Sequence, residues 1–183
     1  PVIYYPFSEL INSGIRDFLI ISNSNQIKFY KELFKDSSKL GLSIKYKVQK
    51  KPDGIAQAIN LGINFVKKRD FYLMLGDNIF LGNGVSNQIR KMSFTKKSCC
   101  LISKKTNNPE LFGIVEYYNN KIKRILEKPK KFISNDAVLG LYFYKNHAIN
   151  EINNLKKSKR GELEITDFNN IFCQKNQVDL IKI

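Results

Sequence analysis

The chain has 183 residues, of which 43% are hydrophobic and 26% charged, and its formal net charge is +15 with a pI near 9.7. This length is enough for one domain with a hydrophobic core. No apolar stretch approaches the roughly 20 residues that a membrane helix needs, so we expect no membrane partner.

The strong positive charge raises the question of a nucleic-acid partner. The basic residues are mostly lysine and are spread along the chain, and no compact arginine-rich arm appears. Asparagine and isoleucine are also abundant, as in proteins encoded by AT-rich genes. We therefore expect compositional drift and no nucleic-acid binding.

The three cysteines are Cys99, Cys100 and Cys173, and the only histidine is His147. Adjacent cysteines suit neither a zinc site nor an ordinary structural disulfide. The pattern predicts reduced thiols and a cytoplasmic protein.

The first half of the chain alternates between helical and strand patterns. Phe7, Leu10 and Ile11 have helical spacing, and Gly14 is placed to end that helix. The following stretches are predicted as strand (16–23), helix (26–41), strand (42–49), helix (54–66) and a strand buried on both faces (71–76).

The second half continues with a helix (86–92), a strand (98–103), a hairpin (112–129) that turns at Asn119-Asn120, a strand (137–145), a helix (161–175) and a final strand (178–183). We find no internal repeat or linker. The alternation predicts an α/β sheet fold in a single domain over residues 1–183.

The stretch "YLMLGDNIF" (72–80) places Asp77 at the end of a predicted strand. On these residues alone a turn is the simpler interpretation, with Gly76 bending the chain. However, ligands of open α/β sheets bind at the carboxyl ends of the strands. A carboxylate there can hold Mg²⁺ against a triphosphate, although it needs a second carboxylate or phosphate oxygens.

The stretch "VQKKPDGIAQAI" (48–59) joins a strand to a helix through a Pro-Asp-Gly turn. Asp53 could simply cap the helix. Alternatively, the amide of Gln49 can both donate to and accept from a nucleobase edge, and Gly54 would let the base approach the backbone.

Further candidates lie in the second half. Glu127 and Lys128 follow the hairpin and are either a solvated charge pair or groups that hold sugar hydroxyls and a phosphate. In "KRGELEITD" (159–167), Thr166 and Asp167 could be ordinary helix residues, and Gly161 and Glu162 an ordinary helix start. "LGNG" (81–84) lacks the context of a phosphate loop and is predicted to be a plain turn.

Taken together, these motifs resemble the glucose-1-phosphate thymidylyltransferases of dTDP-sugar biosynthesis. The matching stretches are "IYYPFSELINSGIRDFLIIS", "YKVQKKPDGIAQA", "LGDNIFLGNG", "FGIVEY", "EKP", "LGLYFYK" and "RGELEITD", which occur in the family's order. The resemblance implies a Rossmann-like nucleotide-diphospho-sugar transferase fold, with a mixed, mostly parallel sheet flanked by helices. It also implies the reaction of dTTP with glucose 1-phosphate to give dTDP-glucose and pyrophosphate.

The resemblance also implies roles for individual residues. The thymine would be read by Gln49, Pro52 and Gly54, and Mg²⁺ would be bound by the catalytic Asp77. The sugar-phosphate pocket would be lined by Gly113, Glu127, Lys128, Val138, Tyr142 and Glu162. The implied partners are the two substrates and further copies of the chain, since the family is usually tetrameric. The implied pathway leads to dTDP-rhamnose and polysaccharide.

Two departures from the family pattern matter. Phe112 stands where relatives usually carry a tyrosine, so any hydroxyl contact there is lost. The family's glycine-rich phosphate loop and its later second Mg²⁺ aspartate have no counterpart, so we expect a central fragment that is inactive as written. A sister uridylyltransferase and a degenerate, non-catalytic subunit remain the alternatives.

Overall fold

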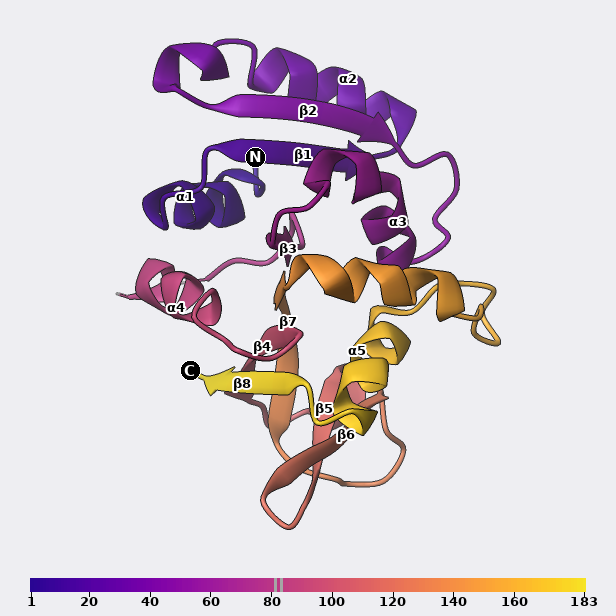
Figure 1. Ribbon diagram of the computed structural model, residues 1–183. Helices are drawn as coiled ribbons and strands as arrows, with labels where there is room; N and C mark the ends of the chain where they lie inside the picture. Colours follow the sequence, from indigo (N-terminus) through magenta and orange to yellow (C-terminus); the bar gives the residue numbers. More distant parts are fainter. Residues whose placement is uncertain (81, 83) are drawn as a thin grey trace.

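The computed structural model describes residues 1–80, 82 and 84–183 (Figure 1). Its helices are α1 (Tyr4–Asn12), α2 (Ser24–Leu33), α3 (Ile55–Val66), α4 (Val85–Met92) and α5 (Ile165–Gln174), with the 3₁₀ helices η1 (Ser37–Leu40), η2 (Pro109–Leu111) and η3 (Asn146–Asn154). Its strands are β1 (Asp17–Ser22), β2 (Ser43–Val48), β3 (Phe71–Met74), β4 (Cys99–Lys105), β5 (Gly113–Tyr118), β6 (Lys121–Glu127), β7 (Asp136–Tyr144) and β8 (Val178–Lys182).

Six strands form one mixed sheet in the order β6-β5-β7-β4-β8, with β3 also paired to β7. β7 is antiparallel to β3, β4 and β5, while β4 and β8 are parallel. Strands β3, β4, β5 and β8 therefore run in one direction, against β7 and β6. This arrangement confirms the predicted mixed α/β fold.

The remaining strands, β1 and β2, form a separate parallel pair, which lies at the top of Figure 1. Among the described residues, β1 pairs only with β2 and β3 pairs only with β7. The free edges of β1 and β3 border a cavity of about 360 Å³, lined by apolar side chains such as Leu19 and Leu73. The β1–β2 pair and the six-stranded sheet are joined by contacts of the helices α1 and α3, and not by a continuous sheet.

Most predicted elements are confirmed, and the hairpin is the clearest case. Asn119 and Asn120 both have positive φ values, 47° and 59°, which a tight two-residue turn between β5 and β6 requires. Gly14 follows α1 with a φ of +96°, as its placement after the helix predicted.

Three expectations about the elements were wrong. The helix predicted for 26–41 ends at Leu33, and η1 follows it separately. The helix predicted for 161–175 begins only at Ile165, which leaves Glu162 in a loop. The residues of β3 are half-buried, and not buried on both faces, because one edge of the strand faces the cavity beside β1.

The hydrophobic core packs on both faces of the six-stranded sheet. Cys99, Cys100 and Cys173 are buried and unpaired among the described residues. Burial raises the pKa of the Cys100 thiol to about 12 and that of Cys173 to about 11, so these thiols stay protonated near neutral pH.

Over the described residues, no helix has the length and apolar character needed to cross a bilayer. Leu81 and Asn83, and with them part of the predicted "LGNG" turn, lie outside the described residues. Gly84 precedes α4 with a φ of +100°.

Candidate active site

A cavity lined by both polar and apolar side chains lies at the carboxyl ends of β2 and β3, where ligands of α/β sheets bind. Its volume is about 640 Å³, and its walls come from the start of α3, from β5 and β7, from the end of β6 and from the loop before α5. Eight of the predicted site residues line it together: Gln49, Pro52, Gly54, Gly113, Glu127, Val138, Tyr142 and Glu162. Segments far apart in the sequence thus meet in one space large enough for a small-molecule substrate.

Two predicted site residues lie outside this cavity. Asp77 lines an adjoining cavity of about 510 Å³, while its neighbours Gly76 and Asn78 line the main one. Lys128, with a positive φ of 45°, donates its backbone N–H to the Phe112 carbonyl at 2.9 Å and lines neither cavity. Its predicted contact with a phosphate therefore has no support from the shape of the cavity.

The Pro-Asp-Gly turn is fastened to the loop before α5. The Leu163 N–H donates to the Asp53 carbonyl at 2.8 Å, and the Ala56 N–H donates to the Leu163 carbonyl at 3.1 Å. Gly54 has a φ of +100°, and a Cβ atom there would lie 2.3 Å from the Leu163 oxygen. The close approach of the Leu163 backbone therefore requires a glycine at position 54, and this contact could not be seen in the sequence.

Gln49 is half-buried at the end of β2. Its Nε2 donates to the Gly54 carbonyl at 3.2 Å and to Oε1 of Gln57, a residue of α3 that the sequence analysis did not single out. The four-residue spacing between Asp53 and Gln57 suggests at most that Gln57 faces the turn, and no local pattern links it to Gln49.

Asp77 is exposed, and its neighbour Asn78 fixes its position. The Asn78 Nδ2 donates to Asp77 Oδ1 at 3.1 Å, and the Asn78 Oδ1 accepts the Gly140 N–H at 3.2 Å. A Cβ atom at residue 140 would lie 2.8 Å from the Asn78 amide, so Gly140 leaves room for this arrangement. Asn78 was overlooked in the sequence because its only visible signal was a polar residue in a turn.

The described residues contain no group of three or more His, Cys, Asp or Glu side chains that could hold a metal ion. Asp77 nevertheless suits Mg²⁺, which binds proteins through one or two carboxylates and completes its shell with phosphate oxygens and water. The single carboxylate of Asp77 therefore fits a metal ion that binds together with a nucleoside triphosphate, whose phosphate oxygens would supply further ligands.

Acidic side chains gather on the opposite wall of the cavity. Glu127, the last residue of β6, accepts a hydrogen bond from the Thr166 hydroxyl at 2.8 Å. Burial, together with the nearby Glu127 carboxylate, raises the pKa of Tyr142 far above its usual range, so its hydroxyl stays protonated. This wall offers hydrogen-bond acceptors suited to sugar hydroxyls.

A second carboxylate on this wall, Glu164, is already occupied. Arg160 binds both of its oxygens, at 3.0 Å and 2.9 Å, and the Ser158 hydroxyl donates to it at 2.7 Å. Burial alone would raise the pKa of Glu164, but these hydrogen bonds outweigh it and lower the pKa. Glu164 therefore shapes the loop that carries Glu162, a role for which no local sequence pattern exists.

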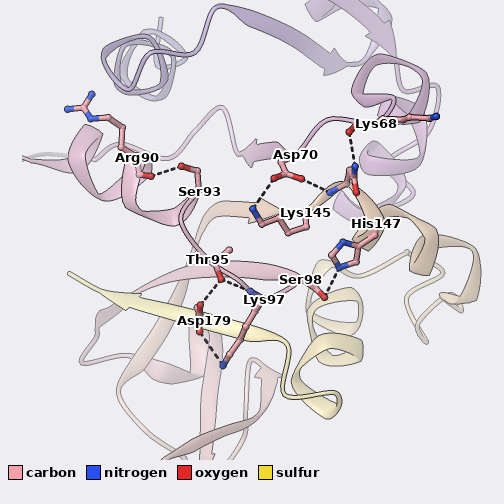
Figure 2. Close-up of polar contacts among 11 residues, drawn as sticks. Lys68, Asp70, Arg90, Ser93, Thr95, Lys97, Ser98, Lys145, His147 and Asp179 are labelled. Carbon is pink, nitrogen blue, oxygen red and sulfur yellow. Dashed lines mark hydrogen bonds and ion pairs between the residues drawn. The ribbon is translucent and has the colours of Figure 1, made fainter.

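A second set of polar side chains lies at the other end of the sheet and is shown in Figure 2. We call it the basal cluster, and its residues are Asp70, Thr95, Lys97, Ser98, Lys145, His147 and Asp179. Asp70 accepts from Lys145 at 3.0 Å, Asp179 from Thr95 at 2.5 Å and from Lys97 at 3.2 Å, and Ser98 lies 3.0 Å from His147. Here the side chains join the amino ends of β3, β4 and β8 to the end of β7.

Comparisons with known proteins agree with this arrangement. The model of the nucleotidyl transferase family matches residues 1–182. A glucose-1-phosphate thymidylyltransferase of Xanthomonas campestris pv. campestris (strain B100) is 41% identical over 181 residues, which cover 98% of this chain and 61% of that protein. One from Neisseria meningitidis serogroup A is 41% identical over 175 residues, covering 95% of this chain and 61% of that protein.

A crystal structure from Bacillus anthracis, described as a glucose-1-phosphate thymidylyltransferase in complex with sucrose, superposes with a TM-score of 0.90 at 33% identity and covers 100% of this chain and 74% of that one. The chain spans about three fifths of the length of the curated relatives it matches, 61% in the two named above. Together, the cavity at the carboxyl ends of the strands, the family match over residues 1–182 and this superposition establish that the chain belongs to the nucleotidyl transferase family.

Proposed function

We propose that the protein containing this chain is a glucose-1-phosphate thymidylyltransferase, which joins dTTP and glucose 1-phosphate to give dTDP-glucose and pyrophosphate. The observation that carries the proposal is the division of one cavity into two unlike walls. Gln49 and the Pro-Asp-Gly turn form one wall, and Glu127, Glu162 and the Tyr142 side chain contribute to the other.

In this proposal the first wall binds the thymine base and the second binds the sugar. The phosphate oxygen of glucose 1-phosphate attacks the α-phosphorus of dTTP in line, and pyrophosphate leaves. Little covalent chemistry falls to the protein, so its contribution is to position the two phosphates and to offset their charge.

Asp77 would supply the carboxylate that holds Mg²⁺, and Asn78 would orient it. The metal, when bound, would neutralise charge on the transferring phosphate. Gly113 and Val138 would shape the sugar pocket, and Pro52 the base pocket. Phe112 would make only apolar contacts there.

The wider setting follows from the same proposal. Residues 1–183 would form a single nucleotidyltransferase domain acting in the cytoplasm, within a homo-oligomer such as a tetramer. Its product would feed dTDP-sugar synthesis, including dTDP-rhamnose for polysaccharide. The net charge of +15 would favour the approach of anionic substrates.

The test is a pyrophosphate-release assay on the protein with whatever flanking sequence its gene encodes. dTTP, UTP and dCTP are each combined with glucose 1-phosphate, galactose 1-phosphate or mannose 1-phosphate, with and without Mg²⁺. We expect Mg²⁺-dependent release to be fastest with dTTP and glucose 1-phosphate. Faster release with UTP would favour a uridylyltransferase, and binding without any release would indicate a non-catalytic subunit.

A further inference from the structure

A chain of hydrogen bonds runs from the surface to Gln49 through the start of α3. Lys157 Nζ lies 3.4 Å from Asp53 Oδ1, and Gln57 Nε2 donates to Asp53 Oδ2 at 3.3 Å. Gln57 Oε1 then accepts from Gln49 Nε2, which also donates to the Gly54 carbonyl at 3.2 Å. Apart from Lys157, which comes from the loop after η3, these groups belong to the turn at 52–54 or flank it.

The hydrogen-bond acceptors at its two ends fix the direction of this series of hydrogen bonds. The carboxylate of Asp53 can only accept a hydrogen bond, so the Gln57 amide must turn its NH₂ group toward it. Gln57 then presents its oxygen to Gln49, and the Gly54 carbonyl is likewise an acceptor. Both neighbours of Gln49 therefore demand its NH₂ group.

With the hydrogen bonds in this direction, Gln49 can offer a ligand only its amide oxygen, Oε1. Both of its amide hydrogens are directed at protein acceptors, and no group among the described residues donates a hydrogen bond to its Oε1. A residue that could in principle donate or accept is thus converted into an acceptor at the wall of the cavity.

We infer that Gln57 is a positioning residue that makes Gln49 select a base carrying an N–H donor at ring position 3. Thymine and uracil carry a hydrogen on N3, whereas N3 of cytosine is an unprotonated acceptor. An amide oxygen facing cytosine N3 would leave two acceptors opposed in a half-buried site. The inference rests on the proposed function and adds to it the physical basis of base selectivity.

The test compares dTTP with dCTP in the Gln57→Met protein, with glucose 1-phosphate as the second substrate. Methionine keeps the length and helix propensity of glutamine but can no longer lock the Gln49 amide, which becomes free to flip and donate. We expect the ratio of kcat/KM for dTTP to that for dCTP to fall about tenfold or more. A parallel loss for both nucleotides with an unchanged ratio would overturn the inference.

Two further variants separate orientation from folding. In the double variant Gln57→Glu, Asp53→Asn, the new amide at position 53 can donate to the new carboxylate at position 57. That carboxylate still accepts from Gln49 Nε2, so the preference for dTTP should return. In a Gln49→Ala background, Gln57→Met should change the ratio no further. Asn60→Met, at an exposed amide on the same helix, is the matched control and should leave the ratio unchanged.

A direct measurement keeps the inference distinct from the proposed function. In ¹⁵N spectra, the side-chain amide hydrogens of Gln49 should exchange slowly with water, and Gln57→Met should speed this exchange. Unchanged exchange would refute the lock whether or not the protein turns over nucleotides. If the lock is present but dTTP neither binds nor reacts, the proposed function fails and the selectivity assigned to Gln49 fails with it.

Discussion

Both ends of the six-stranded sheet carry polar side chains, and they differ in how far those side chains satisfy one another. In the basal cluster, Asp70 and Asp179 each accept from two groups (Figure 2). At the cavity, Asp77 and Glu127 each accept one hydrogen bond among the described residues. Carboxylates with oxygens to spare beside a cavity are suited to a ligand, whereas fully paired ones hold strands together.

The largest effect is expected from Asp77→Asn, which keeps the size of the side chain and removes its charge. If Asp77 holds the metal, we expect Mg²⁺-dependent pyrophosphate release to fall by about 10²-fold or more. The melting temperature should stay within about 2 °C, because Asp77 is exposed. Full activity in this variant would remove Asp77 from the site.

The second test concerns the sugar wall. Glu127→Gln weakens an acceptor while keeping the hydrogen bond from Thr166 possible. We expect KM for glucose 1-phosphate to rise about tenfold and KM for dTTP to change less than about twofold. The reverse pattern in steady-state kinetics would assign Glu127 to the nucleotide instead.

The third test moves to the basal cluster. Asp70→Ala removes the acceptor for Lys145 Nζ and for the Asn146 N–H. Because this leaves a backbone donor without its partner, we expect the free energy of unfolding to fall by about 1–2 kcal/mol, with kcat/KM unchanged. Asp36→Ala, in an exposed pair with Lys39, is the control and should cost less than about 0.5 kcal/mol. A loss of activity without a loss of stability in Asp70→Ala would contradict the comparison.

The smallest expected effect comes from Asp136, which is buried near the cavity end of the sheet but already accepts hydrogen bonds from Tyr117 and Lys182. Burial alone would raise its pKa, yet hydrogen bonds from Lys182 and Tyr117 outweigh burial and lower it. Because the folded pKa lies below the unfolded value of about 3.9, this carboxylate stabilises the fold above that pH. The contribution is lost as pH falls through the folded pKa.

Thermal unfolding between pH 2 and 6 measures this contribution. The melting temperature of Asp136→Asn should depend less on pH in that range than the melting temperature of the unchanged protein. Equal slopes would show that the ion pair with Lys182 adds no net stability. Asp136, the first residue of β7, lies opposite the last residue of β4, so a carboxylate at this end of the sheet does not by itself indicate a ligand role, and its existing partners must also be considered.

Much of this could be predicted from the sequence. Strand and helix patterns with local causes, such as the Asn119-Asn120 turn, were found correctly, and eight candidate residues lie around one cavity. Contacts that depend on distant backbone could not be predicted. The approach of Leu163 to Gly54 and the role of Gly140 beside Asn78 involve residues separated by many positions, and no local pattern encodes them.

The break between β1 and β3 has a consequence for how the molecule opens. Amide hydrogens of β4 are held by β7 on one side and β8 on the other, whereas β1 and β3 are each paired along one edge only within the part of the chain that the structure describes. The helices α1 and α3 must then hold the β1–β2 unit in place largely through apolar contacts and a few polar links, such as the ion pair between Arg69 and Asp17. In residues 1–183 taken alone, the unit containing β1, β2 and α2 should therefore undergo local unfolding at lower free energy than the larger sheet, and its amides should lose protection first in native-state hydrogen exchange.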